Sequence, residues 1–116
     1  DLILNILIAA LSLALLQEQS QAVVLEVGKV AEPCLKLAAG ERLDFSFSAA
    51  APLDFNIHYH TSDDRVFFPV QSKAVSSREG TYIAPVTRDY CLMWTNNTAG
   101  KPARLEYRFQ HYGLKD

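Results

Sequence analysis

The sequence lacks the motifs by which many enzymes and cofactor proteins are recognised. It has no G-x-S-x-G elbow that would expose a nucleophilic serine, no C-x-x-C pair, and no histidine beside either of its two cysteines. The paired carboxylates Asp63 and Asp64 fall in a polar stretch typical of a solvated turn. The sequence therefore predicts a protein that is not an enzyme and that holds no cofactor.

The sequence also lacks a marked excess of charge of either sign. Its 11 basic and 13 acidic residues give a net charge of -2, and its lysines and arginines form no cluster. Nucleic-acid-binding domains normally present a basic patch or stripe. We therefore expect no nucleic acid among the partners of this chain.

One long apolar run stands apart from the rest of the chain, at its N-terminus. Residues 2–16 carry no charge, and as a helix they would span about 22 Å, short of the ~30 Å hydrocarbon core. Ser20-Gln21-Ala22 resembles a cleavage site and favours a signal peptide, whereas the start at Asp1, without a basic region, favours a retained anchor. We expect residues 1–22 to be an N-terminal transmembrane anchor or signal segment, with a buried core helix as a minor alternative. No lysine or arginine flanks the run to orient it.

Residues 23–116 have the length and the pattern of one small β domain. Apolar and polar side chains alternate along Leu43–Phe47, Leu53–Tyr59 and Leu105–Phe109, as in strands with one buried face. Further strands are expected at 23–30, 66–70, 81–84 and 90–94, with connections at 48–52, 61–65, 76–80 and 95–102. The sequence predicts an all-β, antiparallel β-sandwich of about seven or eight strands, preceded by one N-terminal hydrophobic helix.

Two cysteines, Cys34 and Cys91, lie far apart in this domain. In a chain that is routed across a membrane, such a pair most simply forms a disulfide. On the chain-entropy model, closing so long a loop stabilises the fold by about 4 kcal/mol. The alternative is a pair of buried thiols that remain unpaired.

The pair His58 and His60 is the best candidate for metal chemistry. Residues i and i+2 of a strand project to the same face, so both imidazoles can supply ligands to one copper or zinc ion. A third ligand would have to come from another part of the chain: His111, Met93, Asp63 or Asp64. The alternative is two histidines that face solvent or an interface.

The triplet Asn96-Asn97-Thr98 fits an N-glycosylation acceptor. It lies in the clearest turn of the chain, residues 95–102, which we expect to be exposed. Modification there would require a host that glycosylates secreted proteins.

The domain resembles a known family, the Golgi-dynamics (GOLD) β-sandwich of the lumenal domains of p24 cargo receptors. The similarity covers most of Cys34 to Phe109 and is carried by Cys34 with the Gly40-Glu41 turn, Asp54–Ile57, Gly80–Tyr82, Tyr90–Asn96 and Ala103–Tyr107. In that family a disulfide often joins equivalent cysteines, so the resemblance implies a bond between Cys34 and Cys91. The p24 proteins carry their membrane span after the sandwich, whereas the apolar run precedes it here.

Taken together, these features predict a non-catalytic, single-anchor accessory or interaction subunit of a membrane protein complex, with its β-sandwich on the periplasmic or lumenal side. The candidate contact surfaces are two polar strand faces and one apolar stretch: Asp54, Asn56, His58 and His60; Arg104, Glu106 and Arg108; and Val66–Val70 if it is exposed. One alternative is a secreted or periplasmic copper- or zinc-binding module that uses His58 and His60. Another is a cargo or ligand receptor of the GOLD type.

Overall fold

The computed structural model describes residues 18–114. The expected N-terminal hydrophobic helix over residues 2–16 falls outside the described residues, as do Asp116 and the residue before it. Within the described part, no helix is long and apolar enough to cross a membrane.

Seven strands make up the described fold, and every pairing between them is antiparallel. The strands are β1 (Glu18–Leu25), β2 (Val30–Ala31), β3 (Cys34–Leu37), β4 (Arg42–His60), β5 (Val66–Ile83), β6 (Arg88–Thr95) and β7 (Ala103–Tyr112). The all-β, antiparallel prediction is confirmed.

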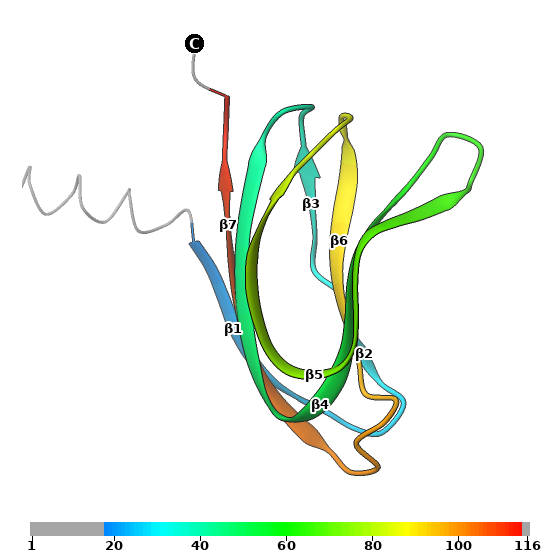
Figure 1. The fold of residues 1–116 in the computed structure, drawn as a ribbon, viewed down its shortest axis with the longest axis vertical. Helices are drawn as coiled ribbons and strands as arrows, with labels where there is room; N and C mark the ends of the chain where they lie inside the picture. The colour runs from blue at the N-terminus through cyan, green and yellow to red at the C-terminus, as the bar shows by residue number, and fades with distance from the viewer. Residues whose placement is uncertain (1–17, 115–116) are drawn as a thin grey trace, which may run out of the picture.

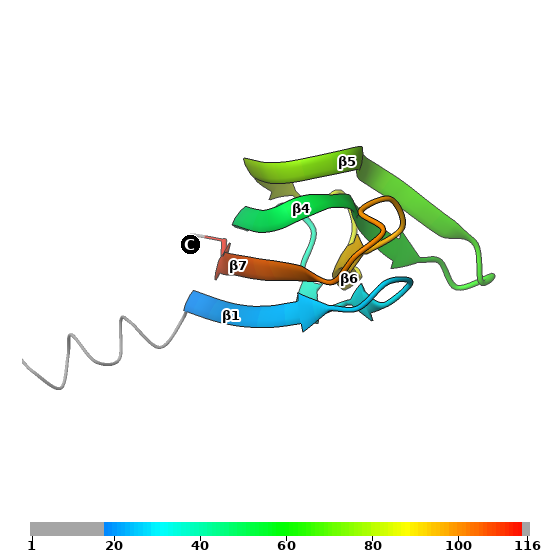
Figure 2. The same ribbon diagram turned by 90° about the horizontal axis from the view of Figure 1, so that it is seen from below.

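A single long hairpin, β4 with β5, organises the sheet. The first part of β4, Arg42–Ala49, pairs with β7, whereas Asp54–Tyr59 pairs with β6. The first half-sheet is therefore β1-β7-β4-β5, and the second contains β2 and β3 beside β6, then β4 and β5. Because β4 and β5 bend together, the two half-sheets face each other and the sheet is nearly closed (Figures 1 and 2).

Two predicted connections are wrong, because they lie inside these long strands. The stretch 48–52 belongs to β4 and the stretch 76–80 belongs to β5. The inward-facing period of two continues in phase from Phe47 through Ala51 to Leu53. Alanine is too small to show this alternation in the sequence, although it occupies the bend.

The N-terminal boundary also differs from the prediction. β1 begins at Glu18 rather than at Val23 and pairs with β7, from Glu18 opposite Gln110 to Leu25 opposite Ala103. Residues 18–22, which we assigned to the anchor or signal segment, are thus an edge of the first half-sheet.

The core lies between the two half-sheets and is rich in aromatic rings. Phe47 and Phe55 of β4 lie 4.9 Å apart between ring centroids, and Phe55 lies 5.2 Å from Trp94 of β6. Trp94 stacks on Tyr107 of β7 at 4.5 Å, so three strands meet in one cluster. Full burial of a large apolar side chain is worth roughly 1.5–3 kcal/mol, so this cluster contributes substantially to stability.

Candidate functional site around the disulfide and the projecting hairpin

The predicted disulfide is present and joins two neighbouring strands. Cys34 of β3 lies directly opposite Cys91 of β6, and the bond closes a loop with a sequence separation of 57. The side chain of Cys34 is exposed, whereas that of Cys91 is mostly buried. The bond fixes the short edge strand β3 to the second half-sheet.

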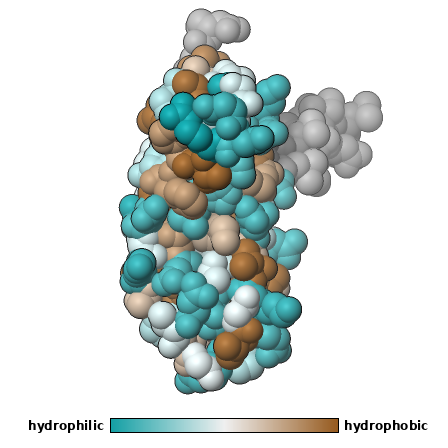
Figure 3. Space-filling model, turned by 90° about the vertical axis from the view of Figure 1, so that its right-hand side faces the viewer, coloured by the Kyte–Doolittle hydropathy of each residue, from teal (hydrophilic) through white to brown (hydrophobic). Residues whose placement is uncertain are grey.

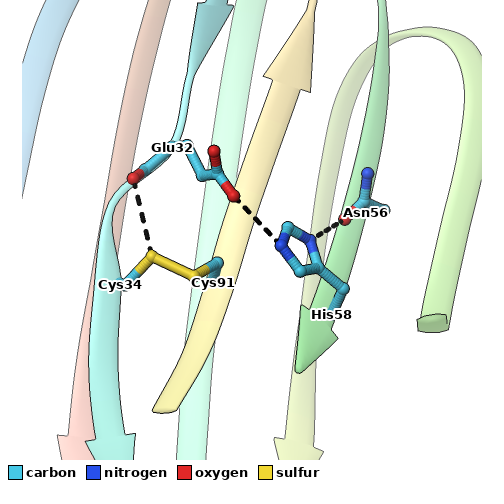
Figure 4. The surroundings of a disulfide bond; sticks show 5 residues. All are labelled: Glu32, Cys34, Asn56, His58 and Cys91. Carbon is cyan, nitrogen blue, oxygen red and sulfur yellow. Dashed lines mark hydrogen bonds and ion pairs between the residues drawn. A yellow bond between two sulfur atoms is a disulfide. The ribbon is translucent and has the colours of Figure 1, made fainter. Parts of the chain in front are cut away.

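His58 lies beside this disulfide, on the outer face of β4, and both of its ring nitrogens meet oxygen atoms. Nε2 lies 3.0 Å from Oε2 of Glu32, and Nδ1 lies 2.7 Å from Oδ1 of Asn56 (Figure 4). The contact between the imidazole and the Glu32 carboxylate links β4 to the segment between β2 and β3.

His58 is buried although it points away from the core. Only 4% of the residue is exposed, because neighbouring side chains cover it. The ring of Phe68 from β5 lies 5.5 Å from the imidazole, and that of His60 lies 5.7 Å away. The sequence correctly placed His58 and His60 on one face, but it gave no sign of Glu32, which approaches from a different strand segment.

Three of the third ligands proposed for a metal ion, Asp63, Asp64 and His111, do not join this histidine pair. Within residues 18–114, the one trio of histidine, cysteine or carboxylate ligand atoms that lie close together is Glu32, Cys34 and Cys91, and its two sulfurs are bonded to each other. Asp63 instead binds Arg65 in the hairpin tip, Asp64 lies beside it, and Met93 is opposite Asn56. His111 lies 3.0 Å from Glu41, in the first half-sheet.

The loop between β4 and β5 projects from the body of the sandwich (Figures 1 and 2). Its tip is held by its own bonds: the N–H of Thr61 donates to the carbonyl of Arg65 at 2.8 Å, and Nε of Arg65 donates to Oδ2 of Asp63 at 2.9 Å. The hydroxyl of Thr61 donates to the other carboxylate oxygen of Asp63, and this bond lowers the pKa of Asp63. The tip is therefore ordered before any partner arrives.

The first residues of β5 expose apolar side chains on both faces of this hairpin, with Phe67 on the face of Tyr59 and Phe68 on the face of His58. Val66, Phe67 and Phe68 are 38%, 43% and 47% exposed, and we call them the hairpin surface. Phe67 stacks on Tyr59 at 5.6 Å, so it is supported from beneath. Figure 3 looks onto the side from which the hairpin projects and shows hydrophobic side chains among hydrophilic ones. The condition that we attached to Val66–Val70 is met, except that Val70 is partly buried.

The other polar face that we considered is already matched in charge. On β7, Arg104 lies 3.2 Å from Glu106, and Nε of Arg108 donates to Oγ of Ser46 at 3.2 Å. Such exposed pairs are worth about 0–1 kcal/mol and are common on solvated sheet faces. The charges of this face are therefore paired with one another, and its exposed apolar group is Val24, which lies opposite Arg104 and is 56% exposed.

The predicted exposure of the turn is confirmed for Asn97 and Thr98 but is wrong for the glycan acceptor, Asn96. Asn96 is 0% exposed, and its Nδ2 donates to the carbonyls of Leu25 at 2.9 Å and Lys101 at 2.8 Å. A glycan would have to replace a hydrogen of this same nitrogen. The buried side chain of Asn96 holds the turn together through these two hydrogen bonds. The amino-acid composition of the turn does not reveal this role.

Comparison with known proteins identifies the fold but not a family. No family model matches the chain, and no curated protein matches it. The solved structures that resemble it include PliG of Aeromonas hydrophila, a periplasmic inhibitor of g-type lysozyme, and the Yersinia pseudotuberculosis-derived mitogen. PliG has a TM-score of 0.59 at 11% identity over 82% of this chain and 86% of its own. The mitogen has a TM-score of 0.53 at 9% identity over 85% and 87%. Both likenesses show an all-β, nearly closed fold, and the finer GOLD assignment stays a prediction.

Proposed function

We propose that this chain is a non-catalytic accessory subunit whose domain docks onto a partner protein of a membrane complex through the hairpin surface. The observation that carries the proposal is the exposure of Val66, Phe67 and Phe68 on a projecting element. Single exposed apolar residues are ordinary, but a run of three large ones at a tip is typical of an interaction site.

The hairpin surface has the physical features of a binding anchor. Aromatic side chains dominate the energetics of protein interfaces, because they bury much area with few rotatable bonds. The tip is fixed by internal hydrogen bonds, and the stacking of Phe67 on Tyr59 limits the motion of its ring. Such preorganisation reduces the entropy that is lost on binding.

The proposed location is outside the cytoplasm, on the periplasmic or lumenal side. The disulfide between Cys34 and Cys91 supports it, because structural disulfides persist mainly in oxidising compartments. The same fold occurs in a lysozyme inhibitor and in a mitogen, which agrees with a non-catalytic role, although a shared fold does not transmit function.

Site-specific photo-crosslinking in cells tests the proposal. A photoreactive residue at Phe68 should cross-link to one discrete partner, whereas the same group at Arg104, on the charge-matched face, should not. The variant Phe67→Ser/Phe68→Ser should lose that partner while it remains folded by circular dichroism, because both side chains are nearly half exposed and lie outside the core cluster. Equal cross-linking from both positions, or an undiminished complex in the double variant, would contradict the proposal.

A copper- or zinc-binding module is the second candidate, favoured by the 5.7 Å separation of the His58 and His60 rings. Metal at Nε2 of His58 would have to displace or recruit Glu32, which now lies 3.0 Å away. This candidate expects stoichiometric metal after purification without chelators and its loss in His58→Ala/His60→Ala. A purified protein that binds neither added copper nor added zinc would eliminate this candidate.

A GOLD-type cargo or ligand receptor is the third candidate. It expects a soluble cargo on the domain instead of a membrane subunit. The identity of the protein cross-linked through Phe68 separates this candidate from the first.

A further inference from the structure

A pocket of about 590 Å³ lies at the base of the hairpin, between β3, β6 and the end of β4. We call it the hairpin-base pocket. The disulfide and Leu35 supply its apolar part. Its polar lining consists of four side chains: Lys36, His60, Arg88 and Asp89. Neither the sequence motifs nor the hairpin surface accounts for this arrangement.

Two cations of this pocket have no counter-ion in the described part of the chain. Neither Lys36 nor Arg88 forms an ion pair there, although Asp89 is the cross-strand neighbour of Lys36. Arg88 donates from Nη1 to the carbonyl of Thr87 at 2.8 Å, which leaves its remaining N–H groups available. Four of the other five arginines are ion-paired, namely Arg42, Arg65, Arg104 and Arg108, and the fifth, Arg78, donates to the hydroxyl of Ser72.

We propose that the hairpin-base pocket receives a carboxylate of the protein that docks on the hairpin surface. This inference rests on the function proposed above. The pocket reaches the hairpin through His60, so a chain that covers Phe68 can place an acidic side chain beside Lys36 and Arg88. A guanidinium is suited to this role because it can donate two parallel N–H bonds to one carboxylate.

The charge of the pocket favours a carboxylate over a phosphate. Lys36 and Arg88 against Asp89 leave one net positive charge, which matches a single negative group. A phosphate monoester carries nearly two negative charges at neutral pH and would be repelled by Asp89. Glu32, whose carboxylate lies within 4.8 Å of the disulfide sulfurs and 3.0 Å from Nε2 of His58, repels either anion, and it repels the doubly charged phosphate more strongly. The partner segment should therefore combine an apolar residue with a neighbouring Asp, Glu or C-terminal carboxylate.

The test uses two matched peptide probes with the full chain in detergent micelles. Acetyl-Phe-Glu-amide and acetyl-Phe-Gln-amide have nearly the same size and differ in one negative charge. Two-dimensional amide NMR should show the Glu peptide shifting the signals of Lys36, His60 and Arg88. Its affinity should exceed that of the Gln peptide by about tenfold, as expected for a charge-assisted hydrogen bond in a half-open site. Arg88→Gln should abolish this preference, whereas Arg104→Gln should retain it.

Four results would overturn the inference: equal affinity for the two peptides, no binding up to millimolar concentration, an unchanged preference in Arg88→Gln, or tighter binding of inorganic phosphate than of the Glu peptide. Asp89→Asn should change the affinity in the opposite direction: without the competing carboxylate of Asp89, the Glu peptide should bind more tightly. The outcome is separate from that of the cross-linking experiment. If Phe68 cross-links to a partner but the two peptides bind equally, the docking function is retained and the carboxylate proposal is wrong. If the Glu peptide is preferred but Phe68 gives no cross-link, the hairpin surface is not the docking site.

Discussion

Gly80→Ala should destabilise the domain through a single aromatic contact. Gly80 of β5 lies directly opposite Phe45 of β4. A methyl group at Gly80 would lie 2.9 Å from Cζ and 3.3 Å from Cε1 of that ring. Phe45 cannot move away freely, because it is 5.3 Å from Phe55 between ring centroids and packs in the core. Overpacking of this kind costs about 1–3 kcal/mol.

The free-energy cost of the contact with Phe45 can be separated from the general effect of glycine in a strand. Without the ring, replacing glycine by alanine in a strand is expected to gain roughly 0.5–1 kcal/mol. The effect of Gly80→Ala should therefore change sign in a Phe45→Leu background, where the atoms at Cζ and Cε1 are gone. The coupling between the two substitutions should be of order 2 kcal/mol, within the range for residues in direct contact.

Urea unfolding of the four proteins of this double-mutant cycle gives the coupling directly. A loss of 1–3 kcal/mol should also lower Tm by about 4–8 °C per kcal/mol in a domain of this size. Additive effects of Gly80→Ala and Phe45→Leu would refute the reasoning. They would also question the register of β4 and β5, and with it the finding that residues 76–80 form a strand instead of a turn.

Three further predictions concern other parts of the domain. Cys34→Ala/Cys91→Ala should lower the free energy of unfolding by about 4 kcal/mol, and a reductant should then have no further effect. The N–H of Ala38 donates to the carboxylate of Glu41 and lowers the pKa of Glu41 below its usual 4.5. The charged carboxylate therefore stabilises the fold above pH 4.5, and this stabilisation is lost as the pH falls through the lowered pKa. Glu41→Gln should therefore flatten the acid limb of stability against pH, and an unchanged limb would contradict this cause. Asn96 should carry no glycan on the folded protein after expression in a glycosylating host, and a glycan found there by mass spectrometry would contradict its internal hydrogen bonds. Asn96→Ala should lower the free energy of unfolding by about 1–3 kcal/mol, because two carbonyls lose their donor.

Much of the β architecture could be predicted, because strands with one buried face produce a period of two. The alternation at Leu43–Phe47 and at Leu53–Tyr59 places the right residues in the core. The sequence divided β4 in two because alanine at the bend is compatible with either a strand or a link. It missed most of β5 because an edge strand buries few side chains and therefore shows little periodicity.

The candidate site was less predictable, because its contacts join segments that are distant in sequence. The pair His58 and His60 was visible from its spacing, but the ion pair with Glu32 depends on how the β2–β3 link crosses the sheet. The unpaired state of Lys36 and Arg88 likewise depends on which carboxylates the fold brings near. A sequence shows charges but not which of them are neutralised.

The size of the native complex after mild detergent extraction tests the docking role of the hairpin most directly. Wild-type protein and the Phe67→Ser/Phe68→Ser variant would be compared by native gel, with mass spectrometry of each band. We predict that the wild-type chain migrates with a larger assembly and that the variant, shown to be folded by circular dichroism, migrates free of it. An assembly that forms equally with both proteins would contradict the hairpin surface as the site of docking.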